Sequence, residues 1–274
     1  MIRLTDAVAY VSEVEHAPPH FQALTERPLV VMVGLTGVGK STILKALAQR
    51  GVDYTPLPDR REITNQIIIA LLQQEDGQSI QPVFDRVKRF EYTARYRAKF
   101  PGGMAHALSR IVVDPAQTRP LLVFDGLRGL NEVQHAISYF PRARFVMLDA
   151  PDMIRLNRLL KREDAFDTTT IRTSLATQNL MAALTAVPNI EAVFAEEQLR
   201  QIARTARATE ISADAVVKKI TIIVEERRNY DSSAARVHLT RTLAPKQVLV
   251  LDTSTHPVDV LARRMAEWLT VDSK

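Results

Sequence analysis

The sequence of 274 residues predicts an α/β fold, with a five-stranded parallel sheet and helices on both of its faces. Short apolar runs rich in β-branched residues alternate with segments of helical spacing, as in repeated strand–helix units. The first run leads without a gap into a glycine-rich turn and then into a helix. A long stretch before the last run has no glycine and predicts an insertion made of helices. The expected strands are residues 29–33, 52–57, 121–125, 144–148 and 247–251.

The turn after the first strand carries the strongest motif, because residues 29–42 have the sequence LVVMVGLTGVGKST. Glycines at positions 34 and 39, then Lys40 and Ser41, form a phosphate-binding P-loop in its required strand–loop–helix context. Backbone N–H groups and the helix N-terminus then face the phosphates. We expect Lys40 to reach the β- and γ-phosphates of ATP, and Ser41 or Thr42, with Ser41 as first choice, to hold Mg²⁺. The expected nucleotide-binding residues are Gly34, Leu35, Thr36, Gly37, Val38, Gly39, Lys40, Ser41 and Thr42.

The segments on either side of this motif have less distinctive patterns. Residues 6–15 predict an N-terminal helix, ended by the two prolines at 18 and 19. The second strand ends near Pro58 and is followed by Arg60 and Arg61. Ligands of open α/β sheets bind beyond the carboxyl ends of the strands, so this pair is expected to bind an anionic acceptor.

Residues 82–100 predict a helix with a basic stripe formed by Arg86, Arg89, Thr93 and Arg97. With Tyr92 and Tyr96 nearby, the stripe could bind phosphate and stack a base. A solvated basic face is the favoured interpretation.

The third strand ends in Asp125, which fits the Walker B pattern of four apolar residues followed by an acid. We expect Asp125 to bind Mg²⁺ or to help activate the acceptor. The fourth strand leads into a helix that carries Arg155, Arg158 and Arg162 on one face. Arg158 and Arg162 are the expected catalytic arginines, and an exposed face without catalytic function is the alternative.

Residues 167–245 predict an inserted helical subdomain, a lid or a partner-binding unit, within a core formed by residues 1–166 and 246–274. Its charged run at residues 225–228, Glu-Glu-Arg-Arg, is expected to be a solvated face. The Walker B strand is expected beside the P-loop strand, which predicts the sheet order second, third, first, fourth, fifth.

Composition narrows the class of protein. The net charge is +5, which fits phosphate-rich ligands, either nucleotides or nucleic acid. There is no cysteine, and the six histidines do not cluster as metal ligands would. No apolar run is long enough to span a bilayer, and the N-terminus lacks a signal-peptide pattern. A cytoplasmic protein is therefore expected.

The layout resembles the nucleoside monophosphate kinase group of P-loop proteins over about residues 29–164 and 246–270. Asp125-Gly126-Leu127-Arg128 is similar to the Asp-Gly-Phe-Pro-Arg motif of adenylate kinases, without the proline. This resemblance implies that Arg128 binds the acceptor phosphate, with Arg60 as the best partner in the acceptor segment at residues 58–112. It also implies that the helix after the fourth strand begins a lid and that residues 253–257 lie near adenine. The expected lid is longer than is usual in the group, and no base-reading motif is evident.

The sequence thus predicts an ATP- and Mg²⁺-dependent phosphotransferase that acts on a small-molecule or nucleotide acceptor. One alternative is a kinase acting on a nucleic-acid end or a modified base. Another is a nucleotide-dependent switch or assembly ATPase whose helical insertion binds a partner protein. Neither the acceptor nor the oligomeric state follows from the sequence.

Overall fold

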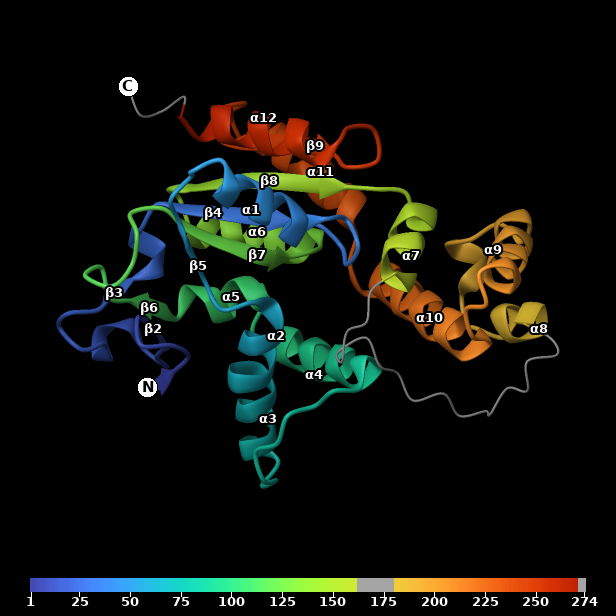
Figure 1. The fold of residues 1–274 in the computed structure, drawn as a ribbon. Coiled ribbons are helices and arrows are strands. Elements are labelled where there is room, and N and C mark those ends of the chain that lie inside the picture. Colours follow the sequence, from blue (N-terminus) through green and yellow to red (C-terminus); the bar gives the residue numbers. More distant parts are fainter. Residues whose placement is uncertain (162–179, 271–274) are drawn as a thin grey trace.

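The computed structural model describes residues 1–161 and 180–270. Its centre is a five-stranded, all-parallel sheet in the order β5-β7-β4-β8-β9 (Figure 1). This is the strand order predicted from the sequence, with the Walker B strand β7 directly beside the P-loop strand β4. The strands are β5 (Thr55–Pro56), β7 (Leu122–Leu127), β4 (Leu29–Val33), β8 (Ala143–Asp149) and β9 (Val248–Asp252).

The strand β4 is buried on both faces, which is why its sequence is a continuous apolar run. Val30 and Met32 pack on one side of the sheet, together with α1 (Lys40–Gln49) and α12 (Val258–Thr270). The alternate residues pack on the other side, against α5 (Met104–Ser109) and α6 (Leu130–Tyr139). The two helical layers cover both faces of the sheet, so ligands are expected at the carboxyl ends of its strands.

The N-terminal segment does not form the predicted helix over residues 6–15. It forms a second, antiparallel sheet in the order β1-β2-β6-β3, with short 3₁₀ turns η1 (Val14–His16) and η2 (Leu24–Glu26). Pairing with β6, about 100 residues later in the chain, overrides the local helical spacing, since periodicity cannot report a distant partner. The strands are β1 (Ile2–Arg3), β2 (Val8–Tyr10), β3 (Gln22–Ala23) and β6 (Ile111–Val113).

Beyond β5 the chain forms one long helical rod, followed by the predicted basic helix. The rod consists of α2 (Arg60–Ile63), a π-helical stretch η3 (Thr64–Ile69) and α3 (Ala70–Glu75). The basic helix is α4 (Arg86–Lys99), which packs against η3. These two elements form one wall beside the carboxyl ends of β5 and β7.

The helical insertion begins after α7 (Asp152–Leu160) and has an apolar core of its own, which Leu156 and Leu159 of α7 join. In Figure 1 its helices lie beyond α7, away from the N-terminal sheet. Helix α11, which the sequence places in the insertion, packs against α6, and its Ala235 and Leu239 join the main core. This packing favours a boundary near residue 230. The elements are α8 (Leu180–Thr185), η5 (Ile190–Ala192), α9 (Glu196–Ala208), α10 (Ala213–Asn229) and α11 (Ser232–Thr242).

Across residues 1–161 and 180–270, no helix combines the length and the apolar character that crossing a membrane requires.

Candidate functional site

The P-loop lies pressed against its neighbours, and two of its glycines are required by that contact. A Cβ atom on Gly34 would lie 2.7 Å from the carbonyl oxygen of Leu148, closer than real Cβ atoms approach. Gly37 has a φ of +85°, and a Cβ there would lie 3.1 Å from the carbonyl oxygen of Arg155. The loop is therefore held between the end of β8 and helix α7, in a conformation that other residues disfavour.

Lys40 is the first residue of α1, directly after the left-handed Gly39. Its Nζ donates hydrogen bonds to the carbonyl oxygens of Gly34 (2.7 Å) and Leu35 (3.3 Å). Burial lowers the pKa of Lys40 to about 8, although the nearby Asp125 carboxylate opposes the shift. The ammonium group is thus held inside the loop, where a β- or γ-phosphate would compensate its desolvation.

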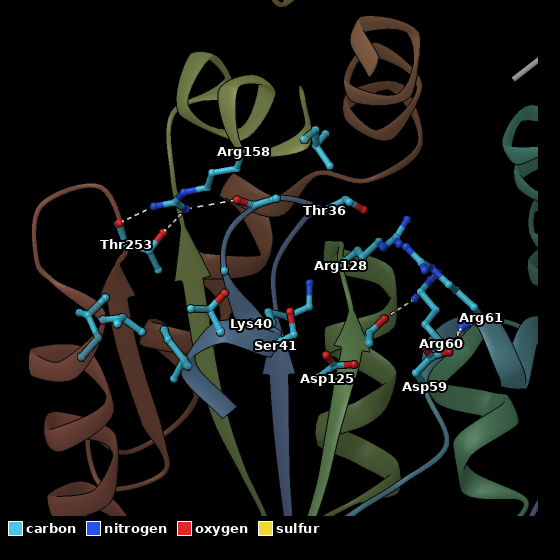
Figure 2. Close-up of a pocket in the computed structure, with 18 of the residues that line it drawn as sticks. Thr36, Lys40, Ser41, Asp59, Arg60, Arg61, Asp125, Arg128, Arg158 and Thr253 are labelled. Carbon is cyan, nitrogen blue, oxygen red and sulfur yellow. Dashed lines mark hydrogen bonds between the residues drawn. The ribbon is translucent and has the colours of Figure 1, made fainter. Parts of the chain in front are cut away.

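A single cavity of about 570 Å³ opens along the P-loop and extends to both sides of it. Figure 2 shows Lys40 and Ser41 in the middle, Arg158 and Thr253 on one side, and a group of charged residues on the other. The charged side is lined by Asp59, Arg60, Arg61, Asp125, Gly126 and Arg128. The opposite side is mainly apolar and is lined by Ile43, Arg158, Leu159, Thr253, His256, Val258 and Leu261.

Asp125 reaches the cavity because strand β7 is irregular at this position. The register of β7 against β4 slips by one residue between Phe124 and Leu127, so Asp125 and Gly126 lie opposite a single residue of β4. Such bulges re-aim a side chain at the edge of a sheet. Burial raises the pKa of Asp125, and the charge of Lys40 works against that shift. The carboxylate thus lies near the P-loop lysine, as the Walker B interpretation requires.

Asp59 is a second carboxylate in this cavity, and it was not among the predicted site residues. It caps helix α2, accepting hydrogen bonds from the backbone N–H groups of Arg61 (2.7 Å) and Glu62 (2.9 Å). Glu62 in turn accepts from the N–H of Asp59, which completes a capping box. The Asp-x-x-Glu spacing of a capping box is visible in the sequence directly after the second expected strand. This position could have indicated that Asp59 lies at the site.

Arg60 lines the cavity, but its guanidinium group is already bound by protein groups. It forms a two-pronged ion pair with Glu132 (2.9 and 2.6 Å), and it donates to the carbonyl oxygen of Gly126 and to the Tyr230 hydroxyl. Burial alone would lower the pKa of Arg60, but Glu132 and Tyr230 raise it above its ordinary value. Arg60 therefore braces the charged side of the cavity through its contacts with Glu132, Gly126 and Tyr230.

Arg128 lies beside Arg60, on the same side of the sheet. Both guanidinium groups lie over the ring of Tyr230, at 5.1 Å for Arg60 and 5.5 Å for Arg128. Arg128 also pairs with Glu226 at 2.8 Å. Burial, Arg60 and Arg86 lower the pKa of Arg128 to about 10, while Glu226 opposes this. The structure thus brings the two predicted arginines together instead of directing them to opposite faces.

A small hollow of about 30 Å³, which we call the arginine hollow, continues the charged side of the cavity. Three residues of the predicted basic stripe line it, and Arg86 (6% exposed) and Arg89 (8% exposed) are buried, so this part of the stripe is not a solvated face; Arg97 lies outside the hollow. Burial and the neighbouring Arg86 and Arg128 lower the pKa of Arg89 to about 10. Positive charge is therefore crowded here. The hollow is lined by Arg60, Arg61, Thr64, Arg86, Arg89, Phe90, Thr93, Arg128 and Tyr230.

The prediction that residues 225–228 form a solvated face is wrong for Glu226. Its side chain is fully buried and contacts Arg86 (3.0 Å), Arg128 (2.8 Å) and Arg155 (2.5 Å). Burial would raise the pKa of Glu226, but these three arginines lower it well below its ordinary value, so the carboxylate stays ionised. Thr36 of the P-loop binds the same carboxylate.

The arginines of α7 have different positions. Arg155 is fully buried and donates to the carbonyl oxygen of Thr36 and to Asp152 and Glu226, so it braces the P-loop. Arg158 lines the cavity and donates to Gly37 O (3.2 Å), Thr253 Oγ1 (2.9 Å) and Thr253 O (2.7 Å). Arg162, the second predicted catalytic arginine, lies outside the described residues.

Within the described ranges, no group of three or more histidine, cysteine, aspartate or glutamate residues could hold a metal ion by itself. Ser41 and Asp125, the two predicted Mg²⁺ ligands, both line the cavity. Mg²⁺ in phosphoryl-transfer sites commonly binds one or two protein groups together with substrate phosphates. The pair fits that mode of binding.

No protein-family model and no curated protein matches the chain, whereas several solved structures are similar to it. A sugar kinase from Janibacter sp. HTCC2649 aligns at 15% identity over 90% of this chain and 95% of its own, with a TM-score of 0.37. Shikimate kinase from Acinetobacter baumannii aligns at 15% over 91% and 96%, with a TM-score of 0.35. A gluconokinase from Sinorhizobium meliloti 1021 aligns at 14% over 90% and 98%, with a TM-score of 0.33. At these levels none of them identifies a reaction for this chain.

Proposed function

We propose that the protein is an ATP- and Mg²⁺-dependent phosphotransferase that acts on a small anionic acceptor. One observation carries the proposal. P-loop residues, among them Lys40 and Ser41, line the same cavity as a group of charged residues near the carboxyl ends of β5 and β7. An ATPase needs only the first part. A kinase needs both, because donor and acceptor must meet beside the transferred phosphoryl group.

The proposed roles follow the two sides of the cavity. ATP lies with its phosphates on residues 34–42 and its base in the apolar side near Thr253 and His256. Mg²⁺, bound by Ser41 and Asp125, supplies charge neutralisation of the phosphates. Lys40 and Arg158 add positive charge around the phosphoryl group.

The crowded arginines support an anionic acceptor. A phosphate or carboxylate between Arg61, Arg89 and Arg128 would compensate the burial and, in second place, the repulsion by neighbouring arginines that lower the pKa values of Arg89 and Arg128. Asp59 and Asp125 lie on the same side, and either carboxylate can accept the proton of an attacking hydroxyl. The acceptor that fits best therefore combines an acidic group with a hydroxyl or second phosphate.

The test is a transfer assay with γ-labelled ATP and Mg²⁺. The acceptor panel contains nucleoside monophosphates, hydroxy acids, sugar acids, neutral sugars and oligonucleotides. Labelled product with an anionic small molecule supports the proposal, and product with neutral sugars alone contradicts the anionic acceptor. An oligonucleotide acceptor is disfavoured, because Arg86 and Arg89 of the basic stripe and the nearby Tyr96 are buried.

A nucleotide-dependent switch is the second candidate, and a specific contact favours it. Helix α10 of the insertion reaches the P-loop through Glu226 and Thr36, so the nucleotide site and the insertion touch directly. This candidate predicts slow ATP hydrolysis without any acceptor and no labelled product in the panel.

A further inference from the structure

We infer that Glu226 is a positioning residue of the nucleotide site, through which the helical insertion holds the P-loop in its phosphate-binding shape. The inference rests on nucleotide binding, the first part of the proposed function, and does not depend on the acceptor. Glu226 lies in α10, 190 residues after the loop that it contacts. Nothing in the P-loop motif predicts such a contact.

Glu226 and its partner Arg155 together bind the N–H, the hydroxyl and the carbonyl oxygen of Thr36. The N–H of Thr36 donates to Glu226 Oε2 (3.1 Å), and its hydroxyl donates to Oε1 (2.5 Å). Its carbonyl oxygen accepts from Arg155 Nε (2.8 Å), and Arg155 in turn donates to Glu226. The peptide groups on both sides of Thr36 therefore cannot rotate without breaking hydrogen bonds to buried charged groups.

The direction of these hydrogen bonds determines what the rest of the loop can bind. The N–H of Thr36 points at a fixed carboxylate, so the phosphate cradle must be formed by the N–H groups that follow it, in the rest of the loop and at the start of α1. A buried carboxylate beside a phosphate site would repel the ligand unless it were compensated. Arg86, Arg128 and Arg155 surround Glu226 and supply that compensation.

The same carboxylate also contacts the acceptor side. Arg128, which lines the cavity, is held by Glu226 at 2.8 Å. One side chain therefore sets the distance between the nucleotide loop and an arginine proposed to bind the acceptor. A shift of α10 would displace both together, which makes α10 a mechanical link between the insertion and the site.

The experiment measures the affinity for MgADP by calorimetry and the melting temperature of the ligand-free protein. Glu226→Gln keeps the volume but removes the charge. Thr36→Val removes the hydroxyl, and with it the contacts to Glu226 and Arg86, and leaves every charge in place. Glu225→Gln is the matched control, because Glu225 lies on the same helix and pairs with Arg228 instead. We expect MgADP affinity to fall at least tenfold in Glu226→Gln and roughly tenfold in Thr36→Val, the loss expected for a hydrogen bond to a charged group. The control should stay within twofold of the wild type.

The double variant separates positioning from stability. If both residues act through one contact, the double variant loses less affinity than the product of the two single losses. If Glu226 only neutralises buried arginines, Glu226→Gln melts at a lower temperature but binds MgADP like the wild type while folded, which overturns the inference. If Glu226→Gln does not fold, Thr36→Val decides, and wild-type affinity there overturns it as well. If the wild-type protein does not bind MgADP at all, that result contradicts the proposed nucleotide site instead.

Discussion

The ion pair between Arg60 and Glu132 gives the sharpest prediction about stability. Both side chains are almost completely buried, 9% and 3% exposed, and Glu132 accepts two hydrogen bonds from Arg60 and one from the N–H of Arg128. Glu132→Gln keeps the shape but leaves the guanidinium group without its countercharge and places an amide N–H₂ against a donor. Removing one partner of a buried pair costs about 3–5 kcal/mol.

That cost translates into a large shift of the melting temperature. In chains of about this size, each kcal/mol corresponds to roughly 2–4 °C, so we expect Glu132→Gln to melt roughly 10 °C lower. Glu75→Gln is the matched control, because Glu75 forms an exposed pair with Lys99. Exposed pairs contribute only about 0–1 kcal/mol. The measurement is thermal unfolding followed by circular dichroism, with urea unfolding as a second readout.

A double variant tests the physical reason. Arg60→Met with Glu132→Met removes both charges and fills the space with apolar atoms, which is often close to neutral. We expect it to melt above either single variant. Two results would refute the reasoning: a Glu132→Gln melting temperature within 3 °C of the wild type, or a double variant less stable than both single variants.

Four further predictions concern Lys40 and Arg158. Lys40→Ala should abolish ATP turnover and leave the circular dichroism spectrum unchanged. Undiminished turnover would show that Lys40 has no role in catalysis. Because the pKa of Lys40 is lowered to about 8, the charged fraction of this residue falls roughly fivefold from pH 8 to pH 9, and MgADP affinity should fall by about the same factor in the wild type but not in Lys40→Met. The same shift means that the unfolded chain binds more protons between pH 8 and 10.5, so the Lys40 contribution to the free energy of unfolding should rise with pH in that window. Arg158→Ala, which removes the contacts to Gly37 and Thr253, should lower kcat by about 10³-fold or more while MgATP affinity changes less; near-normal kcat would leave Arg158 with a structural role only.

The sheet was predictable because its information is local. Four of its strands contain short apolar runs, and the P-loop residues from Gly34 to Ser41 identify the first strand, the loop and the helix together. The exception is β5, where only Thr55 and Pro56 of the expected strand at residues 52–57 pair with β7. The N-terminal sheet was missed because strands of two or three residues leave almost no pattern. In addition, β2 and β3 depend on pairing with β6, which no local window contains.

Most of the charged residues that were predicted for the cavity and line it follow a strand, whereas Arg158 was predicted from its helix face. Asp125, Arg60 and Arg128 were found from their positions at strand ends, whereas Glu226 was assigned to a solvated face. A charge on a helix surface looks the same in sequence whether it meets water or a buried arginine. Contacts with distant residues decide whether such a charge is solvated or buried. For Glu226 these residues are Arg86 and Arg128, which lie 140 and 98 positions earlier in the chain.

The strand orders also dictate when each part of the protein can fold during synthesis. Strand β6 lies between β2 and β3, so the N-terminal residues must wait until about 100 further residues have been made, roughly 5–20 s at ordinary elongation rates. In the central sheet, β8 gains its outer neighbour only when β9, at residues 248–252, has left the ribosome. Until then the nascent chain carries an open strand edge, which is the template on which chains aggregate. The yield of folded protein should therefore depend on what shields β8 during those last steps of translation.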